Sequence, residues 1–111
     1  MNEQTQERLA RNEAFFRQVN ERIKDVADGI IGGDERFEFL CECADASCTE
    51  RLTLSTSDYD QVRQSPTRFV LAPGHASPEI EHVVQHEGDH VVVEKVGIAG
   101  RVAADLDPRA A

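Results

Sequence analysis

The chain has 111 residues, enough for one compact domain and an appendage, and a domain this small is expected to need an additional stabilising element. Its formal net charge is -9, and 30% of its residues are charged. This acidic balance disfavours a nucleic-acid-binding surface, because phosphate contacts need clustered Lys and Arg, and it makes a basic protein surface the favoured partner.

The N-terminal segment predicts one long amphipathic helix from Thr5 to Asp28. Apolar residues recur every seven positions, which is the a/d pattern of associating helices. These positions hold Leu9, Phe16, Ile23 and Ile30, with Asn12, Val19 and Val26 at the complementary ones. The opposite charges spaced four residues apart are expected on the exposed face of the helix, as the pairs Glu7–Arg11, Glu13–Arg17 and Arg17–Glu21.

Two interpretations of this helix stay open. It pairs with a second copy or with a partner helix, in which case exposed Asn12 and Asn20 would set the register, or it packs on its own domain. About three heptads lie at the threshold for assigning a coiled coil, and an isolated helix of ~24 residues needs some partner surface. Gly29 predicts the end of the helix, and Gly32-Gly33 predicts a flexible joint.

The segment after the joint predicts a small, mostly antiparallel sheet domain with one short helix, so the fold class is α+β. Arg36 to Cys43 alternates as a strand and is followed by a second strand from Glu50 to Leu54. Ser55 is the expected N-cap of the short helix, which ends before Pro66. Three more strands are expected near residues 68–72, 80–85 and 90–96, and the tail from Gly100 is expected to be frayed.

All three cysteines fall within eight residues, in the pattern Cys41-x-Cys43-x4-Cys48. Strand alternation places Cys41 and Cys43 on one side, about 6–7 Å apart, within reach of a tetrahedral zinc with ~2.3 Å metal–sulfur bonds. The turn after them can return Cys48 to the same point, and His75, behind the Pro73-Gly74 turn, is the fourth predicted ligand. Zinc is favoured because it prefers thiolate and imidazole ligands, whereas iron–sulfur clusters usually use four cysteines. Three ordinary buried cysteines, or a thiol switch through Cys43 and Cys48, are the alternatives.

The sequence also bears on the compartment. No apolar segment typical of a signal peptide follows Met1, and no stretch approaches the ~20 apolar residues of a membrane span. We therefore expect a cytoplasmic protein without a membrane anchor. In that reducing compartment, cysteines serve as ligands or free thiols more often than as disulfides.

The other histidines, His82, His86 and His90, form a second group. If Glu87-Gly88-Asp89 is a three-residue loop, His86 faces His90 across the hairpin, and His82 faces Glu94. Such a set could form a second metal site or a cluster that charges near pH 6. A solvated sheet face is the commoner outcome for polar strand residues.

Catalytic motifs are absent from the sequence: there is no Gly-rich phosphate loop, no His-Glu-x-x-His and no Gly-x-Ser-x-Gly. Three thiols around one imidazole are more typical of a coordination shell than of a nucleophile with its base. If His75 were not a ligand, Glu42 would be the nearby acid–base group of an open zinc site. An enzyme is therefore the minority interpretation.

The chain carries a set of short motifs between Arg11 and Arg109, namely Arg11-Asn12-Glu13, Val19 to Ile23, Phe39 to Cys43, Cys48, Tyr59 to Arg63, Arg68-Phe69 and Pro73-Gly74-His75. Together they resemble a group of short bacterial, mainly actinobacterial, proteins with a CEC…C…PGH pattern. The resemblance implies a shared fold and a shared metal site, and it implies no activity.

The sequence thus predicts an amphipathic helix over residues 1–30, a small metal-stabilised α+β domain over 34–99 and a tail over 100–111. The favoured function is a small acidic zinc-binding interaction or regulatory module, with a protein partner or a second copy bound through the N-terminal helix. A thiol/zinc redox or metal sensor is the alternative, and a small zinc hydrolase is less favoured.

Overall fold

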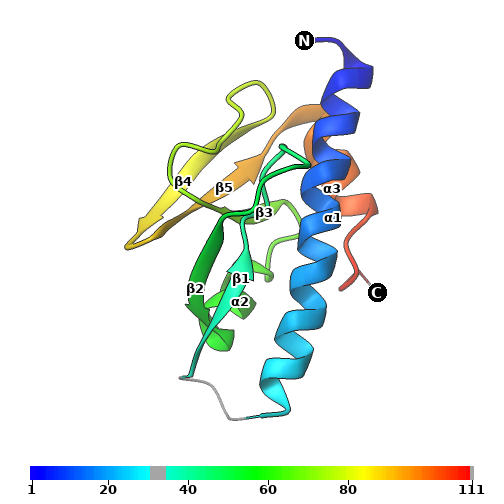
Figure 1. Cartoon of the computed structure of the whole chain (residues 1–111). Coiled ribbons are helices and arrows are strands. Elements are labelled where there is room, and N and C mark those ends of the chain that lie inside the picture. Colours follow the sequence, from blue (N-terminus) through cyan, green and yellow to red (C-terminus); the bar gives the residue numbers. More distant parts are fainter. Residues whose placement is uncertain (31–34, 111) are drawn as a thin grey trace.

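The computed structural model describes residues 1–30 and 35–110, and its fold is α+β, as the sequence predicts (Figure 1). The elements in chain order are α1 (Glu3–Asp28), β1 (Arg36–Leu40), β2 (Arg51–Ser55), α2 (Thr56–Val62), β3 (Arg68–Leu71), β4 (Glu81–Glu87), β5 (His90–Lys95) and α3 (Gly97–Asp105). Helix α1 ends at Gly29 as predicted, and the predicted joint at Gly32-Gly33 lies outside the described residues. Helix α1 runs along one side of the molecule with α3 beside it, and the strands lie on the other side (Figure 1).

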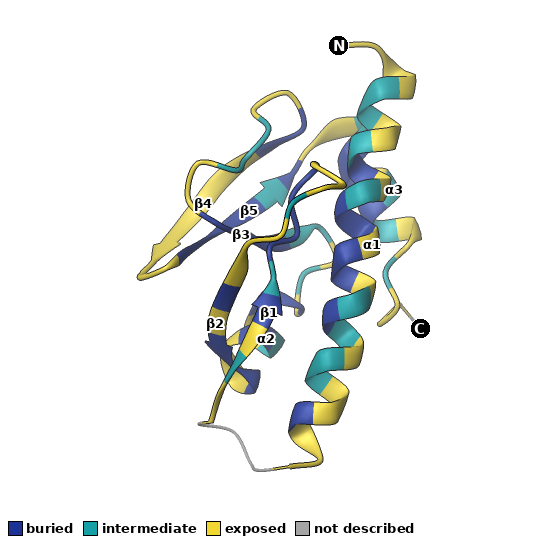
Figure 2. Cartoon of the chain, viewed as in Figure 1, coloured by how far each residue is buried: buried dark blue, intermediate teal, exposed yellow. Residues whose placement is uncertain are grey.

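Two antiparallel sheets form the β part of the fold. Strands β1 and β2 pair from Arg36↔Ser55 to Leu40↔Arg51, and the second sheet has the order β3-β5-β4. The middle strand β5 is buried on both faces, which explains its uninterrupted run of valines, whereas β4 at the edge is exposed along most of its length (Figure 2). The core between the layers includes the stacked rings of Phe39 and Tyr59, whose centroids lie 4.7 Å apart.

The β4–β5 hairpin differs from the three-residue loop considered from the sequence. Glu87 pairs with His90, so the loop has two residues and His86 faces Val91 instead of His90. A register shift between Val83 and Gln85 then leaves one extra residue in β4. This bulge restores the expected pairing of His82 with Glu94, so a shorter loop and a bulge compensate each other.

The face of α1 that is buried is not the predicted heptad stripe. Its buried residues are Ala10, Glu13, Ala14, Phe16, Arg17, Asn20 and Ala27, whereas Val26 and Ile30 are about two-thirds exposed at 67% and 64%. The prediction that Glu13 and Arg17 lie on the exposed face is therefore wrong. The physical reason is that both charged side chains have partners inside the protein.

Arg17 shows how a charged side chain is accommodated in this interface. Its guanidinium donates hydrogen bonds to the carbonyl oxygens of Pro66 and Ala103, each at 2.7 Å. It also lies 4.5 Å from the centroid of the Phe69 ring, at cation–π distance. Two carbonyls from separate parts of the chain thus fix the rotation of α1 about its own axis.

The C-terminal segment is helical, so the expectation of a frayed tail from Gly100 is wrong. Helix α3 buries Ala99, Gly100 and Ala103, and a side chain at Gly100 would meet the carbonyl oxygen of Lys95 at 3.3 Å. The helix lacks a side-chain N-cap and is only nine residues long, so its packing on α1 stabilises it.

Ion pairs continue this attachment beyond α3. Arg109 contacts Glu21 at 2.8 Å and Asp60 at 2.9 Å, and buried Arg63 contacts Glu21 and Asp107. The chain end is thereby tied to both α1 and α2. The division of the chain into residues 1–30, 34–99 and 100–111 stays a prediction.

A group of fully buried charges lies where α1 meets the second sheet. The ammonium of Lys95 is 2.5 Å from Glu81 and also contacts Glu13, and it lies 4.7 Å from the centroid of Phe69. Glu81 additionally accepts a hydrogen bond from the backbone N–H of Ser77 at 2.9 Å. Burial raises the pKa of Glu81 to about 7 and lowers the pKa of Lys95 to about 7. One ammonium here serves two carboxylates, so its loss would leave both unpaired.

Replacing Lys95 with Met is therefore expected to lower the free energy of unfolding at pH 8 by about 3–5 kcal/mol, because an uncompensated buried charge remains. This loss of stability should be smaller at pH 5. Burial raises the pKa of Glu81 in the folded protein, so its charged form destabilises the fold at high pH. As the pH falls, Glu81 becomes protonated and the unpaired charge disappears. Urea unfolding of the variant and the wild type at both pH values measures the difference. Lys24→Met, at the half-buried pair with Asp28, is the control and should cost about 1 kcal/mol or less. Equal losses of stability in the two variants would contradict the conclusion that Lys95 neutralises two buried carboxylates.

Candidate metal centre

Three thiols and one imidazole converge at one end of β1 and β3. The Sγ atoms of Cys41, Cys43 and Cys48 and a ring nitrogen of His75 all lie within 4.8 Å of one another. Nδ1 of His75 is 3.6 Å from the sulfurs of both Cys41 and Cys48. The structure thus brings together all four residues that the sequence singles out, across a separation of 34 positions.

These distances suit a tetrahedral metal ion. Zinc bonds of ~2.3 Å to sulfur and ~2.0–2.1 Å to nitrogen require about 3.8 Å between sulfurs and about 3.5 Å between sulfur and nitrogen. The two measured sulfur–nitrogen distances of 3.6 Å agree with the second value. The cluster can therefore hold a metal ion with small adjustments of its side chains.

Cys41 and Cys43 follow directly on β1. The backbone N–H of Cys41 donates to the carbonyl of Glu50 at 3.1 Å, which extends the β1–β2 ladder by one residue. Because the chain stays extended, Cys41 and Cys43 point to one side and the intervening Glu42 to the other. Both thiols are buried, with exposed fractions of 1% and 2%.

Glu42 points into the core, where its carboxylate is fully buried. One oxygen accepts hydrogen bonds from Asn20 at 2.9 Å and from the hydroxyl of Tyr59 at 2.7 Å, and the other accepts from the backbone N–H of Val70 at 3.1 Å. Burial raises the pKa of Glu42, while these hydrogen bonds act in the opposite direction. The alternative role of Glu42 as an acid–base group at the metal is wrong, because alternation directs the side chain away from the thiols.

Helix α1 holds the cysteine segment from both flanks. Asn20 accepts from the N–H of Leu40 at 2.8 Å and donates to its carbonyl at 2.9 Å, and Asn12 donates to the carbonyl of Ala44 at 2.9 Å. Asn20 is fully buried and Asn12 is half-buried. These asparagines, expected to be exposed and to set a helix register, instead fix the strand that carries the thiols.

A short turn returns Cys48 to the other sulfurs. The side chain of Asp45 accepts hydrogen bonds from the N–H and the hydroxyl of Ser47 at 2.9 and 2.7 Å, and these bonds lower the pKa of Asp45. The carbonyl of Asp45 then accepts from the N–H of Cys48 at 3.0 Å. Cys48 is half-buried and is the most accessible of the three thiols.

His75 is positioned by a turn at the end of β3. Its N–H donates to the carbonyl of Ala72 at 3.1 Å, across Pro73 and Gly74, and Gly74 has a φ of 85°. Pro at the second position and a positive φ at the third define a type II turn. The N–H of Ala72 also donates to the sulfur of Cys41 at 3.1 Å, so the backbone of one residue orients two of the four candidate ligands.

Burial favours the neutral form of the thiols in this cluster. Burial raises the pKa values of the Cys41 and Cys43 thiols, and the neighbouring thiols raise that of Cys41 further. A metal ion reverses this effect, because it binds the thiolate form and neutralises the charge that burial penalises.

The three remaining histidines do not form a second such site. Among the described residues, the cysteine–His75 cluster is the one group of three or more Cys, His, Asp or Glu close enough for a metal ion. His82 and His86 lie on the exposed face of β4, as the solvated-face interpretation expects. His90 is buried, contrary to that interpretation.

The residues that sequence reasoning missed are those that position the ligands, namely Asn12, Asn20, Glu42 and Tyr59. One signal pointed to Glu42: an alternating strand with its two thiols on one side directs the residue between them to the opposite face. The same alternation groups Glu42 with Arg36 and Glu38, which are exposed, so it did not predict that Glu42 is buried. The partners of Glu42 lie 17 to 28 residues away and could not be found by local pattern.

Comparisons with protein family models, with curated proteins and with solved structures gave no match. A functional conclusion therefore depends on the geometry of the chain. No helix in residues 1–30 and 35–110 is both long enough and apolar enough to cross a membrane.

Gly74→Ala is expected to weaken metal binding about tenfold, because the left-handed conformation costs a residue with a Cβ about 1–2 kcal/mol. Nothing lies within 4 Å of the added Cβ, so the effect would come from the backbone and not from a clash. A competition titration of zinc against a chelating dye measures it. Gly88→Ala, in open space and without a positive φ, is the matched control and should bind as the wild type does. Identical affinities for both variants would show that the turn does not position His75.

Proposed function

We propose that the protein is a small zinc-stabilised interaction module in which Cys41, Cys43, Cys48 and His75 hold one structural zinc ion. The observation that carries this proposal is the convergence within 4.8 Å of donors from the segment directly after β1, from the turn that follows it and from the turn after β3. The types of donor support zinc as the metal. Three thiolates and one imidazole are a zinc set, whereas hard cations prefer oxygen donors and iron–sulfur clusters usually take four cysteines.

A structural role is favoured over a catalytic one by the number of donors. Structural zinc sites fill all four positions with protein, and catalytic sites keep one position for water. Glu42 is the nearest acid in sequence, and its carboxylate is bonded to Asn20, Tyr59 and Val70 in the core. A hydrolase would therefore have neither an open metal position nor this general base.

A redox sensor at the same site is the second candidate, and the accessibility of Cys48 is the observation that favours it. An oxidant would reach this half-buried thiol before Cys41 and Cys43. Loss of one thiolate would release the metal and free both turns. The resemblance of the CEC…C…PGH pattern to short actinobacterial proteins, which implies a shared metal site, supports both candidates equally and stays a proposal.

The expected content is one zinc per chain as purified, measured by elemental analysis. Cys41→Ser and His75→Ala should lose the metal and, in zinc at about a thousandfold excess over the wild-type Kd, about 4 kcal/mol of unfolding free energy. His86→Ala, on the exposed face of β4, is the control and should retain both metal and stability. Absorption spectra after cobalt substitution should report four protein ligands. A five-coordinate or water-ligated spectrum would favour the hydrolase, and zinc loss under mild peroxide would favour the sensor.

The interaction surface of this proposal is an apolar groove between the C-terminal half of α1 and β1. It is lined by Val19, Arg22, Ile23, Val26, Ala27, Ile30, Phe37 and Glu38. The groove contains the part of the heptad stripe that the domain leaves uncovered. Its two charged residues, Arg22 and Glu38, have opposite signs, so a two-fold pair of copies can place each Arg22 against the other Glu38. We therefore assign the groove to a second copy of the chain.

Light scattering coupled to size-exclusion chromatography tests the assignment at about 100 μM protein. The wild type should show the dimer mass, and Ile30→Glu should show the monomer mass with little change in unfolding temperature, since Ile30 is exposed. Phe15→Glu is the matched control, because Phe15 is 61% exposed but lies outside the groove, and it should remain dimeric. A monomeric wild type would refute self-association and leave the groove to a different protein.

A further inference from the structure

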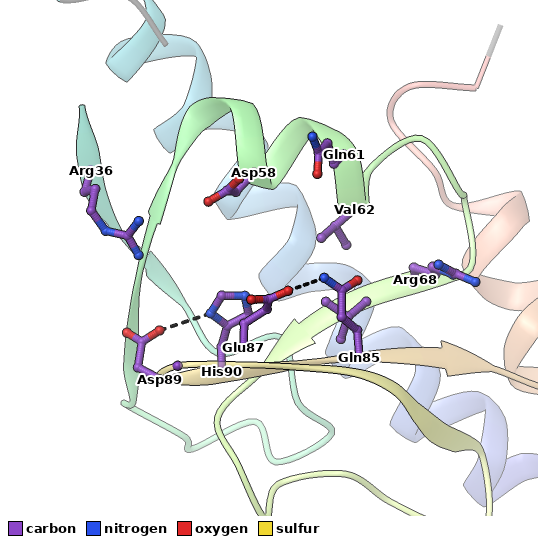
Figure 3. A pocket seen from close by; sticks show the side chains of 11 residues that line it. Arg36, Asp58, Gln61, Val62, Arg68, Gln85, Glu87, Asp89 and His90 are labelled. Atoms are coloured by element: carbon purple, nitrogen blue, oxygen red, sulfur yellow. Dashed lines mark hydrogen bonds and ion pairs between the residues drawn. The ribbon is translucent and has the colours of Figure 1, made fainter. Parts of the chain in front are cut away.

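A polar cleft lies between α2 and the second sheet, and none of its lining residues belongs to the candidate metal centre. Its floor is the side of β4 and β5 that faces α2, and it encloses about 360 Å³ (Figure 3). This volume lies at the lower end of the range for small-molecule pockets. Its lining residues are Arg36, Asp58, Gln61, Val62, Arg68, Gln85, Glu87, Gly88, Asp89, His90 and Val92.

His90 is the buried polar group at the centre of this cleft, and Figure 3 shows it between Asp89 and Glu87. Its side chain is only 7% exposed, and Nδ1 lies 3.0 Å from Asp89. Asp89 also accepts from the N–H of Thr53 at 2.9 Å, so its carboxylate is anchored to β2. Because an ionised carboxylate only accepts hydrogen bonds, Nδ1 of the neutral ring carries the hydrogen and Nε2 is left as an acceptor. Nε2 has no hydrogen-bond partner among the described residues.

Charges of both signs surround this ring without ion-pair partners. In the described part of the chain, Arg36, Asp58 and Glu87 form no ion pair. Arg36 donates one hydrogen bond to the carbonyl of Thr53 at 2.7 Å, which leaves its other N–H groups free. Arg68, by contrast, is paired with Glu94 at 2.9 Å. Glu87 accepts a hydrogen bond from the side-chain amide of Gln85 but has no cationic partner among the described residues. The cleft therefore presents one guanidinium and two carboxylates without a counter-charge, and one imidazole acceptor.

We propose that this cleft binds a small zwitterion, in which an ammonium group and a carboxylate are joined by a short aliphatic chain. The ammonium donates to Nε2 of His90 and to the carboxylate of Glu87, while the negative charge of Asp58 acts on it at longer range. The carboxylate is bound by the guanidinium of Arg36, which is suited to two parallel N–H bonds. The aliphatic part lies on Val62 and Val92, the two apolar lining residues.

The charge balance distinguishes this ligand from simpler ones. An anion would meet Asp58 and Glu87 beside the one free guanidinium, and a diamine would place a second ammonium against Arg36. A molecule with both charges places its carboxylate at Arg36 and its ammonium on the acidic side of the cleft. A divalent metal ion is disfavoured, because these acids and His90 do not come close enough together to form a ligand group.

Isothermal titration at low salt, with zinc-loaded full-length protein, tests the proposal. The probes are glycine and L-leucine for the α-amino acid spacing, 6-aminohexanoate for a longer spacing, and 1,5-diaminopentane and hexanoate for each charge alone. At least one zwitterion should bind more tightly than both single-charge probes. Arg36→Gln and Glu87→Gln should each weaken that binding about tenfold or more, because each removes a charged hydrogen-bond partner.

Arg101→Gln is the matched control, since Arg101 is an exposed arginine of α3 outside the cleft, and it should leave the affinity unchanged. Arg36 and Glu87 are both exposed, so their variants should fold, and circular dichroism checks this. The ring signals of His90 in NMR spectra should shift on binding and identify the site. No binding of any probe at about 10 mM, equal binding of the diamine with no effect of Arg36→Gln, or an unshifted His90 would each overturn the proposal.

Discussion

The buried carboxylate of Glu42 is the interaction on which the rest of the fold and the candidate metal centre depend. Its hydrogen bonds join β1 to α1 through Asn20, to α2 through Tyr59 and to β3 through the backbone of Val70. A buried carboxylate is costly unless its oxygens have partners, so this arrangement is stable only when all three elements are in place. The direction of Glu42 also sets the direction of the thiols on either side of it.

In the proposed function, folding of the core and binding of a metal ion are coupled through the segment that begins at β1 and carries Cys41 and Cys43. The core fixes Cys41 and Cys43 because Glu42 and the two asparagines of α1 hold their backbone. Cys48 and His75 instead come from turns, which have fewer contacts of their own. A bound metal ion would add a constraint on these turns, and the core supplies two pre-arranged thiols for it.

Sequence patterns predicted the features that depend on local geometry or on ligand chemistry. They did not predict which polar side chains are buried by contacts with residues far away in the chain. The α+β class, the Ser55 cap and the meeting of three cysteines with His75 follow from alternation, capping and ligand chemistry. The burial of Arg17 does not, because its partners, the carbonyls of Pro66 and Ala103, are 49 and 86 residues away. Helix α3 was missed for the same reason: small residues against a neighbouring helix leave little local signal.

The rotation of α1 explains why an apolar groove exists at all. An apolar heptad stripe would ordinarily select the buried face of such a helix. Here Arg17 and Asn20 hold the helix through hydrogen bonds to specific carbonyls, and these bonds cannot be made in another rotation. The polar contacts thus override the apolar pattern, so Val26 and Ile30 stay at the surface. Directional contacts specify which face of α1 the domain uses, and part of the apolar face is left at the surface.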